Sequence, residues 1–171
     1  MIEMIHVCSL ARLHQTVEET GARHIITLLK DISLVERPPS VDAKNHLHID
    51  VDDITCPVDG YRHPCEDHVA RLMRFVASWD RSAPMVIHCY AGISRSTASA
   101  YAAACALNPD RDEMAIAKKM RHASRTAMPN SLIVSLADRI LERQGRMIAA
   151  IEAIGPGDMA YEADPFSLDL K

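Results

Sequence analysis

The sequence predicts an α/β fold in which a central, mostly parallel sheet is flanked by helices on both faces. Short apolar runs of strand length alternate along the chain with longer segments whose apolar residues recur at helical spacing. The run IITLL at residues 25–29 is nearly continuous in apolar character, which is typical of a strand buried on both faces. Strands that alternate with helices favour a parallel sheet covered on both sides.

Length and composition favour one globular domain spanning residues 1–171. The chain is 48% apolar and 25% charged, an ordinary balance for a globular protein that buries its own core. A net charge of −4 argues against a nucleic-acid-binding protein dominated by phosphate contacts. The five cysteines are widely spaced, the N-terminus is not signal-like, and no apolar run approaches the ~18 residues that a membrane span needs. We therefore expect a cytoplasmic protein with no disulfide framework and no membrane span.

The first half of the chain predicts three strands and one helix. In order, they are a strand in residues 1–7, a helix in 10–23, a strand at 25–29 and a strand at 46–51. Gly21 is the expected stop of the helix, because glycine readily adopts the left-handed conformation that ends helices. The connection over residues 31–46 is polar and contains Pro38-Pro39, so we expect it to be non-helical at that point.

The second half predicts one further strand, at residues 84–88, and four helices. These helices are expected to begin near Pro64, Ser94, Asn108 and Asn130. Asn108 and Asn130 are of the residue type that caps helix N-termini. The last helix is expected to extend past Gly145, and residues 158–171 are expected to form a surface tail.

The stretch VIHCYAGISRSTASA, residues 86–100, carries the strongest sign of function. Five residues separate Cys89 from Arg95, enough to close a small ring around a tetrahedral anion between a strand and a helix. Gly92 permits a positive φ, so successive backbone N–H groups can face inward as an anion nest. The helix N-terminus adds positive potential, and Arg95 offers a planar fork of donors that matches phosphate oxygens. The expected phosphate-binding residues are Tyr90, Ala91, Gly92, Ile93, Ser94 and Arg95.

Cys89 lies in the same positive field. An ordinary thiol is only a few per cent ionised at neutral pH, and helix N-termini and nearby cations favour the thiolate. A thiolate at the bottom of a phosphate cradle is a nucleophile aimed at phosphorus. Ser96 is placed to hydrogen-bond the sulfur and assist its departure in a second step, and His88 is expected to order the loop through hydrogen bonds to its backbone.

A plainer interpretation exists for each residue taken alone. A single cysteine after an apolar strand is usually a small core residue, and an arginine at a helix start is usually a solvated charge. This plainer interpretation fits the whole loop poorly. It does not account for the preceding strand, the intervening glycine, the serine after Arg95 and the helix that follows, all in one stretch.

The stretch HCYAGISRS, residues 88–96, resembles the signature loop of the cysteine-based protein tyrosine phosphatases. Ser94 stands where the larger receptor-type enzymes usually have glycine, so the loop resembles the dual-specificity branch, with a likeness to small bacterial members. The predicted order of strands and helices from about residue 2 to residue 142 is similar to that family's small catalytic core. Pro129-Asn130 matches the Pro-Asn pair that commonly precedes its last helix.

The resemblance implies a two-step reaction without a metal or other cofactor. Cys89 would attack phosphorus to form a phosphocysteine, while Arg95 and the loop amides hold the oxygens. A carboxylic acid would protonate the leaving oxygen and then act as base on the hydrolytic water. The family places this acid on the loop after the preceding strand, where the chain offers Asp50, Asp52 and Asp53. Register against the family's pattern selects Asp53, with Asp52 as the alternative. Asn130 is a supporting residue in the same comparison.

A zinc site is a competing hypothesis for the segment that follows. Cys56, His63, Cys65 and His68 are all possible zinc ligands. Their spacing matches no closed zinc module, so we interpret the segment as a loop and first helical turn near the catalytic mouth. Cys8, Cys65 and Cys105 are interpreted as buried or half-buried thiols, any one of which could protect Cys89 by a reversible disulfide.

The sequence predicts a protein phosphatase acting on phosphotyrosine, and on phosphoserine or phosphothreonine if its pocket is shallow. Its partners would be a phosphorylated protein or a small phosphomonoester; the sequence specifies no oligomeric state. Alternatives are a phosphoinositide or small-molecule phosphomonoesterase, and a non-catalytic phosphate-binding module. Sulfur transfer or arsenate reduction would need partner thiols that the sequence does not locate. Tyr90, Ala91 and Ile93 in the loop, rather than lysines, argue against a polyphosphoinositide substrate.

Overall fold

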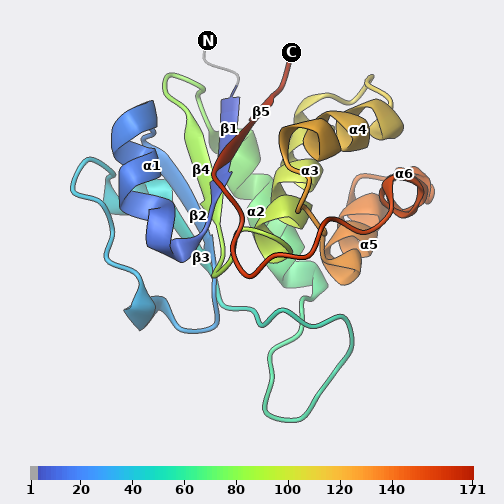
Figure 1. Cartoon of the computed structure of the whole chain (residues 1–171), viewed down its shortest axis with the longest axis horizontal. Helices are drawn as coiled ribbons and strands as arrows, with labels where there is room; N and C mark the ends of the chain where they lie inside the picture. Colours follow the sequence, from blue (N-terminus) through green and yellow to red (C-terminus); the bar gives the residue numbers. More distant parts are fainter. Residues whose placement is uncertain (1–3) are drawn as a thin grey trace.

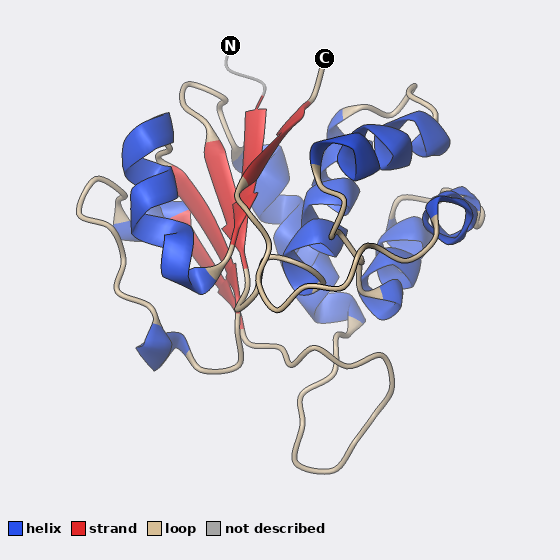
Figure 2. Cartoon of the chain, in the orientation of Figure 1, coloured by secondary structure: helices blue, strands red, loops and turns tan. Residues whose placement is uncertain are grey.

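A computed structural model describes residues 4–171 as a mixed five-stranded sheet with helices on both faces (Figures 1 and 2). The strand order is β3-β2-β4-β1-β5. The strands are β1 (Met4–Cys8), β2 (His24–Leu28), β3 (His46–Ile49), β4 (Met85–His88) and β5 (Phe166–Asp169). The α-helices are α1 (Leu13–Thr20), α2 (Glu66–Ser78), α3 (Arg95–Leu107), α4 (Glu113–Ala123), α5 (Ser131–Ile140) and α6 (Arg146–Ile154). The predicted fold class is confirmed.

The first four strands are parallel, so their carboxyl ends meet at one edge of the sheet. β4 pairs with β1 on one side and with β2 on the other, which puts it in the middle. The loops after β2, β3 and β4 therefore all leave from the same edge, and the long loop between β3 and α2 projects away from the body there (Figure 1). Ligand sites in such sheets form at this edge.

Helix α3 fills the space between the sheet and the outer helices. Residues 96–105 of this helix are all buried, and most of them are alanine or serine. Such small side chains let α3 lie close to the sheet while α2, α4 and α5 pack around it (Figure 1). A separate, smaller apolar cluster lies under α1 on the opposite face of the sheet and includes Leu13 and Val17. The helix that carries the signature loop is thus anchored in the main core.

The predicted cap at Asn108 is wrong, and so is the single last helix. Asn108 ends α3, whereas Asp112 caps α4 by accepting a hydrogen bond from the backbone N–H of Ala115 at 2.8 Å. The expected last helix divides into α5 and α6, because the chain turns after Ile140 and Gly145 takes a φ of 82° before α6. Asn130 does cap α5, as predicted, with its side chain accepting from two backbone N–H groups.

The predicted surface tail at residues 158–171 is also corrected. Its end forms β5, which pairs antiparallel with β1 and covers what would otherwise be an open sheet edge. Phe166, Leu168 and Leu170 are buried, with exposed Ser167 between the first two, which is the alternation of an edge strand. Residues 158–162 are exposed. The first strand was expected in residues 1–7; of these, 1–3 lie outside the described residues.

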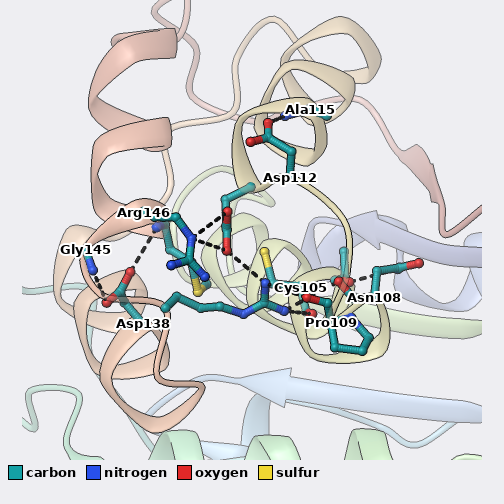
Figure 3. Close-up of polar contacts among 12 residues, drawn as sticks. Cys105, Asn108, Pro109, Asp112, Ala115, Asp138, Gly145 and Arg146 are labelled. Atoms are coloured by element: carbon teal, nitrogen blue, oxygen red, sulfur yellow. Dashed lines mark hydrogen bonds and ion pairs between the residues drawn. The ribbon is translucent and has the colours of Figure 1, made fainter.

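A buried ion pair between Arg143 and Glu113 ties the outer helices to the end of α3. Figure 3 shows the polar contacts around Cys105, Asp138 and Arg146 at this junction. Arg143 donates to the carboxylate of Glu113 at 2.8 Å and to the carbonyl of Cys105 at 2.6 Å. Asp138 accepts from the backbone N–H groups of Gly145 and Met147, which fixes the turn between α5 and α6. Because these charged groups are paired and hydrogen-bonded, they can be buried at this junction.

Candidate active site

The loop between β4 and α3 turns its carbonyl groups outward. The carbonyls of residues 90, 91, 93 and 94 accept hydrogen bonds from backbone N–H groups of Leu10, Ala163, Met128 and Asn130, which belong to surrounding segments. The described chain has no cis peptide bond. Because C=O and N–H point in opposite directions in a trans peptide, the N–H groups of residues 91, 92, 94 and 95 face the inside of the loop. The inner surface is therefore a set of hydrogen-bond donors suited to an anion.

Gly92 is the residue that lets the loop close. Its φ is +73°, a left-handed conformation that favours glycine. A Cβ atom at this position would lie 2.8 Å from the carbonyl carbon of Cys8 and 2.9 Å from the backbone nitrogen of Ser9. The loop is thus packed directly against the carboxyl end of β1, and neither the backbone angle nor the space admits a side chain.

Cys89 lies buried at the base of this ring. Ser96 Oγ is 3.1 Å from Cys89 Sγ, within hydrogen-bond distance. Helix α3 begins at Arg95, so the positive end of its dipole is directed at the loop. The inward amides, the helix terminus and the Ser96 hydroxyl all favour negative charge near the sulfur.

The guanidinium of Arg95 is bonded to the protein through Nη1 and has donors left for a ligand. Its Nη1 donates to the carbonyl of Val51 at 2.9 Å, which fixes the guanidinium against the end of β3. Its Nε is buried and has no hydrogen-bond partner among the described residues. A buried guanidinium nitrogen requires an acceptor, and an oxyanion inside the ring would supply one.

His88 belongs to a buried hydrogen-bond chain that the sequence did not indicate. Its Nδ1 lies 3.3 Å from the carbonyl oxygen of Cys89, and its Nε2 lies 2.7 Å from Thr27 Oγ1. The same hydroxyl lies 2.7 Å from Nε2 of His46. Burial lowers the pKa of both His88 and His46 to about 4, so both rings are neutral near pH 7.

The directions of these hydrogen bonds follow from chemistry. A carbonyl only accepts, so His88 Nδ1 donates to Cys89 and the other ring nitrogen accepts from the Thr27 hydroxyl. The hydroxyl oxygen then accepts from His46 Nε2–H. One sequence signal could have revealed the chain: Thr27 is a polar residue within an otherwise apolar strand, and a buried hydroxyl needs a partner.

The three candidate aspartates have different partners. Asp50 pairs with Arg62 and lies 4.0 Å from Arg71. Asp52 accepts from the backbone N–H of Arg62 at 2.7 Å and lies 3.5 Å from Lys30. Both are thus engaged on the outer side of the loop that follows β3.

Asp53 alone among these aspartates contacts the signature loop within the described structure. Its Oδ1 accepts from Ser94 Oγ at 2.7 Å and from Asn130 Nδ2 at 2.9 Å. Asn130 also donates to the carbonyl of Ile54 and caps α5 through its Oδ1. One side chain therefore joins α5 to the loop after β3, which carries Asp53. The sequence suggested Asn130 as a cap and supporting residue but not this contact.

The possible zinc ligands do not form a cluster. Cys65 and His68 contact each other at the start of α2, with Sγ and Nδ1 3.5 Å apart, while Cys56 is exposed on the long loop. Across residues 4–171, no group of three or more potential ligand side chains is arranged to hold a metal ion.

Known proteins provide an independent comparison. The family model for protein-tyrosine phosphatase matches residues 54–132, a stretch that contains the loop and all of α3. The PTP-2 phosphatase of Cydia pomonella is 18% identical, with a TM-score of 0.61 over 79% of this chain and 84% of that chain. DUSP15 is 17% identical, with a TM-score of 0.60 over 88% and 92%, and human DUSP28 is 16% identical, with 0.60 over 82% and 89%. These comparisons support the expected likeness to the cysteine-based protein tyrosine phosphatases of the dual-specificity type.

The family-model match and the structural neighbours also support the expected enzyme class, a phosphoric monoester hydrolase, with a fold of the dual-specificity type. At these identities the structural neighbours show the fold alone. A search of curated protein sequences gives no match. No helix in residues 4–171 of the phosphatase has the length and apolar character needed to cross a membrane.

Of the other cysteines, Cys8 and Cys105 are buried, Cys65 is half-buried and Cys56 is exposed. Burial raises the pKa of the Cys8 and Cys105 thiols to about 12, so both are protonated at neutral pH. Arg125, on the loop before α5, lies exposed and pairs with Asp158 at 3.1 Å.

Proposed function

We propose that the protein is a protein phosphatase that hydrolyses phosphotyrosine monoesters through a phosphocysteine intermediate. The observation that carries the proposal is the ring itself: a buried cysteine below inward-facing amides and beside the partly unpaired guanidinium of Arg95. Such a ring favours three equatorial phosphoryl oxygens, whose charge must be held while phosphorus changes partners.

In the first step Cys89 Sγ attacks phosphorus. The S–P bond forms as the bond from phosphorus to the ester oxygen breaks, and Asp53 gives its proton to that oxygen. Ser94 and Asn130 both donate to Asp53 Oδ1, which supports Oδ2 as the oxygen that carries the proton. The first product is the dephosphorylated hydroxyl, and the phosphoryl group remains on sulfur.

In the second step water attacks the phosphocysteine. Asp53, now ionised, accepts a proton from the water as the new P–O bond forms and the S–P bond breaks. The sulfur leaves as a thiolate, and the Ser96 hydroxyl 3.1 Å away is suited to donate a hydrogen bond to it. Inorganic phosphate then leaves the ring, and the enzyme is ready for another turnover.

His88 has a positioning role in this proposal. Its imidazole is neutral and donates a hydrogen bond from Nδ1 to the carbonyl of Cys89. The Thr27 hydroxyl fixes this tautomer by donating to Nε2. The ring therefore receives support at its first residue without a charge that would titrate near neutral pH.

The experiment is a metal-free assay with p-nitrophenyl phosphate followed by a panel of phosphopeptides and phosphoinositides. We expect turnover in the presence of a chelator, loss of turnover in Cys89→Ser, and preference for phosphotyrosine peptides. Vanadate should inhibit, since it occupies the same ring as phosphate. Phosphate binding without turnover in the wild-type protein would contradict the catalytic assignment, and a preference for phosphoinositides would contradict the proposed substrate.

A further inference from the structure

A groove lies beside the signature loop, on the side where the C-terminal segment passes. Its volume is about 330 Å³, and its lining consists of Leu10, Ala11, Tyr90, Ala91, Tyr161 and Glu162. Two of these residues, Tyr90 and Ala91, are also the first two residues after the cysteine. The groove therefore borders the loop that forms the ring in which the phosphoryl group is expected to bind.

Two tyrosines at this groove are unusually exposed. Tyr90 is 64% exposed and Tyr161 is fully exposed at 103%, although aromatic rings are ordinarily at least partly buried. Exposed aromatic side chains near a binding site are typical contact residues, because they bury much apolar surface while losing little side-chain freedom. Neither tyrosine side chain belongs to the apolar core of the protein.

The outer wall of the groove is fixed in place. The backbone N–H of Ala163 donates to the carbonyl of Ala91 at 2.9 Å, and the Ser9 hydroxyl donates to the Glu162 carboxylate at 2.6 Å. Farther back, Gly157 lies so close to the carbonyl of Ala127 that a Cβ atom would come within 2.6 Å of its oxygen. The segment is thus anchored on both sides of the exposed Tyr161, and the groove exists before a ligand binds.

We propose that this groove binds a large apolar or aromatic side chain that flanks the phosphorylated residue of a peptide substrate. The proposal rests on the proposed function, and it deepens that function by naming a feature of the substrate. Successive residues of an extended peptide are about 3.3–3.6 Å apart, so a neighbour of the phosphorylated residue reaches the groove while phosphorus is at the ring. Tyr161 is the specificity residue, and Tyr90 is shared by the groove and the ring.

The charge of the groove favours a peptide over a lipid surface. Glu162 is the charged side chain in the lining, and the whole chain has a net charge of −4. Anionic membranes attract basic segments and repel acidic ones. An uncharged apolar side chain is compatible with this lining, whereas a second phosphate or an anionic headgroup is not.

The test compares two phosphotyrosine peptides that differ at the neighbouring positions, which are phenylalanine in one and serine in the other. The enzymes are the wild type, Tyr161→Ser, and the matched control Met159→Ser. Met159 is 93% exposed on the same segment but does not line the groove. We expect Tyr161→Ser to lower kcat/KM for the phenylalanine peptide by about 3- to 10-fold, the usual effect of one aromatic contact.

The same variant should leave kcat/KM unchanged for the serine peptide and for p-nitrophenyl phosphate, and Met159→Ser should change none of the three. Wild-type enzyme that hydrolyses both peptides with equal kcat/KM would overturn the groove proposal and leave the proposed function standing. Wild-type enzyme that hydrolyses p-nitrophenyl phosphate but neither peptide would overturn the proposed function. A Tyr161→Ser effect confined to phosphoinositide vesicles, or a concentration-dependent dimer that this variant abolishes, would assign the groove to a membrane or to a second copy and overturn the peptide proposal.

Discussion

Replacing Asp53 by asparagine should remove acid catalysis and leave the phosphate ring intact. Asparagine has nearly the same shape, and its side-chain oxygen can still accept from Ser94 and Asn130, whose donor atoms lie 2.7 Å and 2.9 Å from Asp53 Oδ1. What it lacks is a proton to give to the leaving oxygen. General acid catalysis contributes roughly 10²–10⁴-fold, so we expect kcat to fall by that factor, or about 2.7–5.4 kcal/mol in the activation barrier.

The matched control is Asp52→Asn, one residue away. Asp52 pairs with Lys30 at 3.5 Å and bonds a backbone N–H, both outside the ring. A partly exposed ion pair contributes about 0–1 kcal/mol to stability, so this variant should remain folded. Because the contacts of Asp52 lie outside the ring, its kcat should stay within about threefold of the wild type. The contrast between adjacent carboxylates separates a role in proton transfer from a general effect of charge.

The assay measures both variants with phenyl phosphate and p-nitrophenyl phosphate. A phenolate leaving group needs a proton more than p-nitrophenolate, which is a stable anion, so the loss in Asp53→Asn should be larger with phenyl phosphate. Vanadate inhibition should remain close to that of the wild type, because the ring is unchanged. The reasoning is refuted if Asp53→Asn retains wild-type kcat, or if Asp52→Asn shows the larger loss.

Three further predictions concern the loop and the buried histidine chain. Gly92→Ala should lower kcat/KM on the order of 10²-fold or more, since its Cβ would lie 2.8 Å from the backbone of Cys8 and displace the loop; wild-type kinetics would contradict the packing described. Thr27→Val should lower the free energy of unfolding by about 1–3 kcal/mol in urea denaturation, because two ring nitrogens lose their partner; an unchanged midpoint would contradict the hydrogen-bond chain. Burial lowers the pKa of His88 from 6.5 to about 4, so between these pH values the unfolded chain binds more protons than the folded chain. The free energy of unfolding should therefore fall as the pH drops from 6.5 toward 4, by at most about 1.4 kcal/mol per pH unit from this histidine. A free energy of unfolding that rises on acidification through this interval would contradict the buried neutral ring.

The sequence predicted the signature loop because its chemistry is local. Cys89, Gly92 and Arg95 lie within seven consecutive residues, and the strand before them and the helix after them follow from short patterns. The choice between Asp52 and Asp53 as the general acid could not be made from a local pattern. It depends on Ser94 and Asn130, which are 41 and 77 residues from Asp53, and no spacing within the acidic loop encodes those contacts.

The errors at the chain's end have a similar origin. The alternation of FSLDL is a weak strand signal, and it becomes a strand because β1 offers an unpaired edge for it. The groove beside the signature loop also depends on this pairing, because β5 brings the preceding residues 159–163 past Ala91. Sequence patterns predicted the elements, whereas contacts between distant segments determined which residues surround the ring.

The most direct test of the mechanism is to trap the covalent intermediate. Wild-type enzyme mixed rapidly with p-nitrophenyl phosphate, quenched in acid and digested should yield a peptide containing Cys89 that is heavier by one phosphoryl group, and Cys89→Ser should yield none on a time scale of turnover. Ser96→Ala should increase the trapped fraction, because the Oγ that lies 3.1 Å from the sulfur assists its departure in the second step. Turnover with the phosphoryl group found on another residue, or undiminished turnover in Cys89→Ser, would contradict nucleophilic attack by this sulfur.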